Sequence, residues 1–167
     1  MIYTDSGKYA IRAMTYLASR PADQLPISAS DVAEAEGIPP FYLAKVLQDL
    51  ARDGILASVR GRGGGFLLKR APEEIHVLEV LQAVENIARL TTECVLGLDE
   101  CNDTVSCPLH SIWKKFRESL LDRLADMTVA DLVIEQKRKR RYLKSRKSST
   151  AASSEARVNA DTSKASG

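Results

Sequence analysis

The sequence predicts a mainly α-helical fold with a small β-hairpin wing, that is, a winged helix-turn-helix followed by a long helix. Two observations carry this prediction. Apolar residues recur at helical spacing in two short segments that a sharp turn separates, as in a helix-turn-helix. Two short β-type runs joined by a glycine-rich turn follow directly, at the position that a wing would take.

The first expected helix spans residues 7–19. Ser6 is a suitable N-cap, and Pro21 ends the helix because proline disfavours helical geometry in the residue before it. Residues at helical spacing give this helix one buried face, namely Ala10, Ala13, Met14 and Leu17.

The helix-turn-helix pair comes next. Ser28 with Asp31 resembles a capping box and predicts a short helix over residues 28–36. Gly37 fits the left-handed position after that helix, and a pair of prolines suits the first turn of the next one, which Gly54 stops. The second helix of the pair has an inward stripe of Leu43, Val46, Leu47 and Leu50.

The wing is expected from two β-type runs, residues 55–60 and 65–69, joined by a turn that contains three glycines and one arginine. A fourth helix is expected over about 75–85. Pro108 then opens a long helix to about residue 127, and Thr128 starts a short one. The long helix has a wide apolar stripe of Leu109, Ile112, Trp113, Phe116, Leu120 and Leu124.

Charge and hydropathy narrow the function classes. No apolar run reaches the length of about 18 residues that a membrane helix needs, and the N-terminus has no signal-peptide pattern, so a cytoplasmic protein is expected. Residues 1–136 carry 14 basic and 20 acidic side chains, a net charge of −6. Any DNA binding by this part must therefore use a local basic patch.

The C-terminal tail has a different composition. Residues 137–147 carry eight positive charges and no negative one, and residues 148–167 are rich in serine and alanine. This composition predicts a disordered tail. Its basic part is either a solvated run of charge or a source of sequence-independent phosphate contacts.

A winged helix-turn-helix predicts binding to double-stranded DNA. The helix after the turn fits the major groove and exposes Tyr42, Lys45 and Gln48. At the wing tip, Gly61 lets the backbone approach DNA closely, and the arginines beside it can enter the negative minor groove. These wing residues are Arg60, Gly61 and Arg62, and further phosphate contacts are expected from Lys8 and Arg12.

All three cysteines lie within 14 residues, which points to metal binding or thiol chemistry. Six residues separate Cys94 from Cys101, five separate Cys101 from Cys107, and two separate Cys107 from His110. Three thiolates on a loop can hold an iron–sulfur cluster, with His110 as a fourth ligand. With Cys107 at the N-cap of the long helix, the helix dipole would favour thiolate and an anionic cluster. Mixed cysteine and histidine ligation favours a 2Fe–2S over a 4Fe–4S cluster.

Three other interpretations stay open at this point. Zinc accepts the same three cysteines and one histidine, although structural zinc sites typically have about two to four residues between paired cysteines. A thiol switch needs only two of the cysteines. In the third interpretation, His110 is an ordinary surface histidine of the helix.

The motifs together identify a family. Residues 7–18 (GKYAIRAMTYLA), 38–68 (IPPFYLAKVLQDLARDGILASVRGRGGGFLL) and 77–85 (VLEVLQAVE) resemble the Rrf-type winged-helix transcription regulators, which include IscR, NsrR, RirA and CymR. The resemblance covers about residues 1–135. Cys107-Pro108-Leu109-His110, followed by Trp113, is most similar to the IscR-like cluster-binding branch.

The resemblance implies Cys94, Cys101, Cys107 and His110 as cluster ligands. It also implies a homodimer in which the long helices of two subunits cross, bound to a roughly palindromic operator, usually as a repressor. In the nitric-oxide-sensing branch an aspartate on the partner's first helix is a ligand. Lys8 occupies that position here, which disfavours that arrangement.

The expected organisation has four parts: residues 1–90 bind DNA, 91–107 form the cluster loop, 108–136 hold the dimerisation helix and a short following helix, and 137–167 form the tail. The expected function is transcription regulation through an iron–sulfur cluster that senses iron–sulfur status, redox state or nitric oxide. The alternative is a metal-free regulator that acts through thiol oxidation or a protein partner. No enzyme motif and no small-molecule substrate site is expected, because neither histidine lies in a recognisable catalytic pattern.

Overall fold

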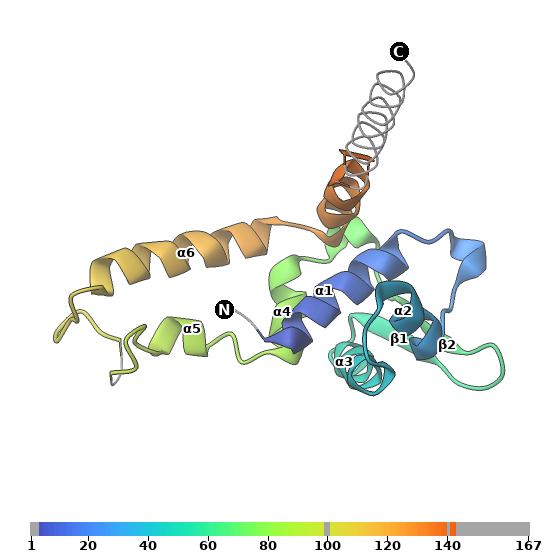
Figure 1. Ribbon diagram of the computed structural model, residues 1–167, viewed down its shortest axis with the longest axis horizontal. Helices are drawn as coiled ribbons and strands as arrows, with labels where there is room; N and C mark the ends of the chain where they lie inside the picture. Colours follow the sequence, from blue (N-terminus) through green and yellow to red (C-terminus); the bar gives the residue numbers. More distant parts are fainter. Residues whose placement is uncertain (1–3, 99–100, 140, 143–167) are drawn as a thin grey trace, which may run out of the picture. The chain divides into compact units, whose positions relative to one another are not determined.

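The computed structural model describes residues 4–98, 101–139 and 141–142, and Figure 1 gives its course. The chain divides into two units, residues 1–133 and 134–167. The helices and strands are α1 (Asp5–Ala18), α2 (Ala29–Glu36), α3 (Pro40–Arg52), β1 (Leu56–Val59), β2 (Gly65–Leu68), α4 (Val77–Val84), α5 (Arg89–Thr92) and α6 (His110–Asp126). Short 3₁₀ turns span Ala22–Gln24 and Pro72–Glu74.

The predicted fold class is confirmed, since the first unit is a winged helix-turn-helix followed by a long helix. Helices α2 and α3 pack against each other and against α1, and the hairpin β1–β2 follows them. The short helix α5 was not predicted, because four residues are too few to show a helical period.

Helix ends follow from local capping, with one correction. The Oγ of Ser28 accepts the backbone N–H of Asp31 at 3.1 Å, so the predicted start of α2 is confirmed. The prediction that Ser6 caps α1 is wrong. Thr4 is the N-cap, and its Oγ1 accepts the N–H of Ser6.

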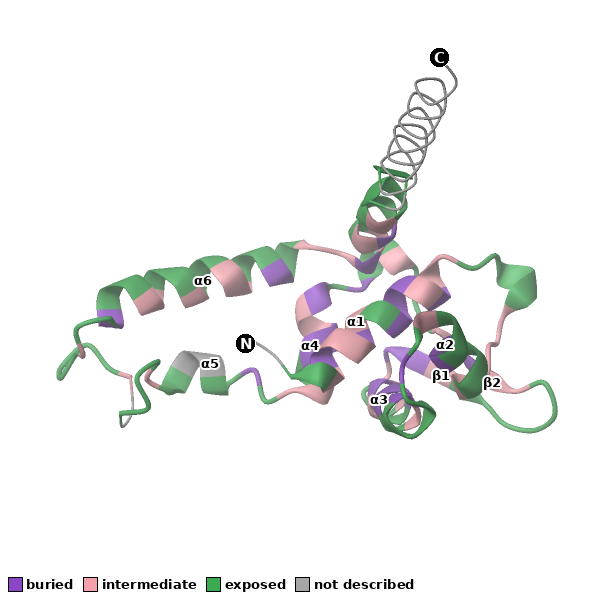
Figure 2. Cartoon of the chain, in the orientation of Figure 1, coloured by how far each residue is buried: buried purple, intermediate pink, exposed green. Residues whose placement is uncertain are grey.

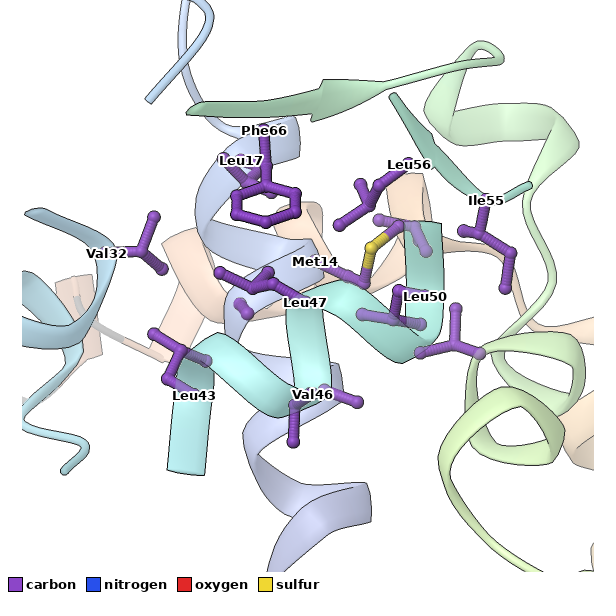
Figure 3. Close-up of a cluster of buried hydrophobic side chains, with 14 of the residues drawn as sticks. Met14, Leu17, Val32, Leu43, Val46, Leu47, Leu50, Ile55, Leu56 and Phe66 are labelled. Atoms are coloured by element: carbon purple, nitrogen blue, oxygen red, sulfur yellow. The ribbon is translucent and has the colours of Figure 1, made fainter. Parts of the chain in front are cut away.

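The main core lies between α1, α3 and the hairpin. Met14 and Leu17 of α1 meet Leu47 of α3 and Phe66 of β2, as Figure 3 shows. The predicted inner faces of α1 and α3 are confirmed, because all of the following are buried: Ala10, Ala13, Met14, Leu17, Leu43, Val46, Leu47 and Leu50.

Backbone hydrogen bonds join the hairpin to the segment just before α2. Strands β1 and β2 pair antiparallel, with Leu56 opposite Leu68. Ile27 adds a further bridge to the wing, because its carbonyl accepts the N–H of Phe66 at 2.8 Å and its own N–H donates back at 3.1 Å. Gly65 makes this approach possible, since a Cβ there would lie 2.2 Å from the Ile27 oxygen.

After α6 the chain returns to the start of α4. The N–H of Val77 donates to the carbonyl of Met127, and the N–H of Val129 donates to that of Ile75, both at 2.8 Å. A second small core joins the same elements, with Leu81 of α4 packed near Leu124 of α6. The C-terminal end of α6 is thereby fixed to α4 and to the segment that precedes it.

The expected helix after Thr128 is present over residues 129–139. Thr128 and Asp131 form a full capping box, with Thr128 N–H to Asp131 at 3.0 Å and Asp131 N–H to Thr128 Oγ1 at 3.2 Å. The bond from the Thr128 backbone lowers the pKa of Asp131. The helix includes the first residues of the basic segment, whereas the expected disorder of residues 143–167 concerns residues outside those described.

Over the described ranges, no helix combines the length and the apolar composition needed to cross a membrane.

Candidate functional site

The three cysteines and His110 line one cavity. They lie in the segment that follows α5 and at the first residue of α6, and Figure 1 shows the course of this part of the chain. The cavity encloses about 620 Å³. Its wall is formed by Cys94, Leu98, Cys101, Asn102, Val105, Ser106, Cys107 and His110. All four predicted metal ligands are therefore brought together by the fold.

These four side chains stand as two pairs. The Sγ atoms of Cys94 and Cys107 lie 3.7 Å apart, and the Sγ of Cys101 lies 3.2 Å from Nδ1 of His110. In the described part of the chain, no three histidine, cysteine or acidic side chains converge as the ligands of one metal ion would. Two pairs fit a two-iron cluster, in which each iron takes two protein ligands.

The predicted position of Cys107 at the N-cap of α6 is wrong. The N-cap is Leu109, and the carbonyl of Cys107 accepts the N–H of His110 in a turn that precedes the helix. Pro108 opens that turn and not the helix itself. Cys107 and His110 therefore do not share a face of α6, and the Nδ1 of His110 lies near the Sγ of Cys101 instead.

Hydrogen bonds favour the charged forms of three side chains in and near the cavity, namely Cys94, Asp103 and Lys114. The backbone hydrogen bond from Leu96 lowers the pKa of Cys94, with a smaller contribution from Cys107, and burial opposes both. A thiolate is the form of cysteine that binds metal and attacks disulfides. The hydrogen bonds from Lys114 and then His110 lower the pKa of Asp103, and Asp103 raises the pKa of Lys114.

The candidate DNA-contacting side chains of α3 face solvent. Tyr42 is 61% exposed, and Lys45 and Gln48 are also exposed. The sequence interpretation missed Phe41, which is 81% exposed and stands edge-to-face with Tyr42 at 5.9 Å between ring centroids. Its apolar ring is a candidate contact for a thymine methyl group in the major groove.

The tip of the wing also faces solvent, because Arg60, Gly61 and Arg62 are all exposed.

The two candidate phosphate contacts of α1 have protein partners. Lys8 pairs with Asp5 at 2.6 Å, and Arg12 bonds both the carboxylate and the carbonyl of Glu36 at the end of α2. In the described structure Arg12 therefore holds α1 to α2.

Two further residues escaped the sequence analysis. Glu85 accepts the backbone N–H groups of Thr4 at 2.8 Å and Gly7 at 3.0 Å, so it caps α1 from the end of α4. Asp103 accepts Nε2–H of His110 at 2.8 Å. Neither carries a sequence signal, since each bond depends on how distant or irregular segments fold.

Comparisons with known proteins agree with this description. A family model, Rrf2, described as an iron-dependent transcriptional regulator, matches residues 3–135. The HTH-type transcriptional regulator IscR of Erwinia tasmaniensis is 35% identical over 136 residues, which are 81% of each chain. IscR of Yersinia pseudotuberculosis shows the same identity, coverage and length of match.

Solved structures show the same fold. IscR of T. potens matches 80% of this chain and 86% of its own, with a TM-score of 0.63 and 26% identity. CymR of B. subtilis, the global cysteine regulator, matches 79% of this chain and 95% of its own, with a TM-score of 0.66 and 21% identity. From motifs, fold and relatives together, the chain belongs to the Rrf2 family of DNA-binding transcriptional regulators.

Proposed function

We propose that this chain is a homodimeric repressor that senses iron–sulfur status, redox state or nitric oxide through an iron–sulfur cluster. The observation that carries the proposal is the convergence of Cys94, Cys101, Cys107 and His110 on one cavity. The names of the IscR relatives support it.

The donor pairs support a 2Fe–2S cluster over a 4Fe–4S one. Cys94 and Cys107 would hold one iron, and Cys101 and His110 the other. When bound, the cluster supplies a redox-active group that oxidants and nitric oxide attack. Leu98 and Val105 line the cavity beside the cysteines and are themselves largely exposed, so small molecules would have access to the cluster.

Absorbance and metal analysis of the full-length protein, purified without oxygen, test the cluster. We expect bands between about 320 and 460 nm, with two irons and two acid-labile sulfides per subunit. Removal of iron with a chelator should bleach these bands. A colourless protein that takes up no iron on anaerobic reconstitution would contradict the cluster and leave DNA binding untouched.

The DNA-contacting surface is proposed to consist of the exposed face of α3 and the wing. Tyr42, Lys45 and Gln48 would contact base edges and phosphates, with Phe41 beside them. Arg60 and Arg62, with Gly61 between them, would contact the minor groove. Lys8 and Arg12 would contact phosphates after breaking their ion pairs with Asp5 and Glu36. The basic residues 137–147 would add sequence-independent phosphate contacts.

The N-terminal half of α6 is proposed as the dimer interface. Figure 2 shows that α6 is exposed over much of its length. Ile112 is 70% and Phe116 45% exposed, and Trp113 stacks on Phe116. Such a run of large apolar side chains favours association, and the C-terminal half is already packed on α4.

A charged side chain in this interface should separate the subunits. We expect Phe116→Asp to shift the protein from dimer to monomer in sedimentation equilibrium, because a carboxylate buried in an apolar interface has no partner. Phe41→Asp is the matched control: it places the same charge at an exposed phenylalanine of α3, and the dimer should persist. A dimer that survives Phe116→Asp unchanged would place the interface elsewhere.

A thiol switch is the second candidate, favoured by the 3.7 Å between the sulfurs of Cys94 and Cys107. Hydrogen peroxide would oxidise the two thiols to a disulfide, with two water molecules as the reduced product. CymR of B. subtilis is named for cysteine regulation. Regulation that survives iron chelation and is lost on thiol alkylation would favour this candidate.

We further propose a cytoplasmic location, where operator DNA is found, and no enzymatic activity, because the relatives are named as transcriptional regulators.

A further inference from the structure

We propose that Asp103 is a positioning residue that decides which nitrogen of His110 faces the cysteines, and that Lys114 holds Asp103 in place. The inference rests on the proposed cluster, but it concerns side chains that are arranged before any iron binds. Asp103 lies in the loop that precedes α6, and His110 and Lys114 lie on the first two turns of that helix, which Figure 1 labels.

His110 is held from both sides of its ring. The side chain is almost fully buried, with 8% of the residue exposed. Nδ1 lies 3.2 Å from the Sγ of Cys101, and Nε2 lies 2.8 Å from Oδ1 of Asp103. A neutral imidazole carries one N–H, and an ionised carboxylate can only accept. Nε2 therefore carries the hydrogen, and the lone pair of Nδ1 points toward Cys101.

Lys114 fixes the carboxylate that sets this arrangement. Its Nζ donates to both oxygens of Asp103, at 2.8 Å and 3.1 Å. Asp103 itself is exposed on the loop between Cys101 and Cys107, where a carboxylate without such a partner would rotate freely. Lys114 lies one helical turn after His110 on α6, so the helix fixes both groups in register.

The hydrogen bond between Asp103 and His110 would leave Nδ1 of His110 free to bind iron as the fourth ligand. In the other tautomer, Nδ1 would carry a hydrogen directed at Cys101 and could not bind metal. Carboxylates that orient a metal-binding histidine typically contribute about 10–100-fold to metal affinity. The same contact also joins the cysteine loop to α6, which an ordinary ion pair would do equally well. An experiment must therefore distinguish control of the His110 tautomer from a contact that only holds the loop against α6.

Nitrogen-15 NMR of the reduced, metal-free, full-length protein measures the tautomer directly. The chain has only two histidines, so in His76→Gln the signals of Nδ1 and Nε2 of His110 are the only imidazole signals. We expect one tautomer with the hydrogen on Nε2 in the wild type and a mixture in Asp103→Ala. Asp103→Asn should restore the single tautomer, because its amide oxygen still accepts the hydrogen bond. Lys114→Met should give a mixture.

Cluster retention gives a second readout. After reconstitution, loss of visible absorbance to a chelator should be about 10–100-fold faster in Asp103→Ala than in wild type. Lys115→Met is the matched control, because Lys115 is the adjacent exposed lysine and no described contact joins it to Asp103. An unchanged His110 tautomer in Asp103→Ala would overturn the proposal. Wild-type protein that takes up no iron would refute the cluster alone, and the tautomer comparison would still decide the role of Asp103.

Discussion

Cys107→Ala should remove the visible absorbance of the anaerobically purified protein and nearly all of its iron and sulfide. Cys107 lines the cavity and pairs with Cys94 at 3.7 Å, so the variant leaves one of the two donor pairs with a single ligand. Loss of a residue that only supports a ligand already costs about 10–100-fold in metal affinity, and loss of a ligand should cost at least as much. The absorbance spectrum and the iron and sulfide assays measure the effect.

The same variant should change operator binding. If the cluster regulates DNA affinity, the dissociation constant should shift by about 5–150-fold between wild type and variant, the usual range of coupling between two sites. Ser106→Ala is the matched control, because Ser106 lines the same cavity and supplies no sulfur or nitrogen ligand. A Cys107→Ala protein that binds DNA and responds to oxidants like wild type would refute the sensing role.

Replacing Arg60 and Arg62 together with alanine should abolish specific DNA binding. Both arginines are exposed, and both lie in the short segment that joins β1 to β2. Each arginine that contacts DNA contributes about 1–3 kcal/mol, so affinity for an operator selected from random duplexes should fall by about 30-fold or more. Fluorescence anisotropy at fixed salt concentration measures this loss.

Two controls separate contact from net charge. Lys115→Ala with Arg123→Ala removes two positive charges from exposed positions on α6, and operator affinity should change little. The slope of affinity against salt should fall in the wing variant if its arginines contact phosphates. An unchanged dissociation constant in the wing variant would show that the wing does not contact the operator.

The DNA-binding half could be predicted because its signals are local. Each signal depends on residues that are close together in the sequence. These signals are the apolar period of α3, the serine cap of α2 and the glycines of the wing. Thr4 was missed as the cap of α1 because Ser6 is an equally good capping residue by type. The choice depends on Glu85, which bonds Thr4 from 81 residues away.

The residues of the candidate cluster site could be predicted from the sequence, but which side chains lie next to each other could not. The spacing of three cysteines and a histidine shows that they are available together, and the cavity they line agrees with that. The sequence suggested Cys107 as the N-cap of the long helix, whereas Cys107 lies in the turn before α6 and the His110 ring lies near Cys101. Asp103 was missed for the same reason, because its role exists only once the loop is folded against α6.

The two hydrogen bonds between Ile27 and Phe66 have a consequence for how a signal can reach DNA. Ile27 immediately precedes the cap of α2, so the wing and the helix-turn-helix are fastened together and share one core. The wing cannot swing away from α3 without breaking these bonds and exposing Phe66. In the proposed dimer, each subunit would therefore present a DNA-contacting surface in which the wing and α3 keep a fixed spacing. A signal at the cysteines would change affinity by altering the distance or the angle between two such surfaces in the dimer, and operators with altered half-site spacing would respond to it differently.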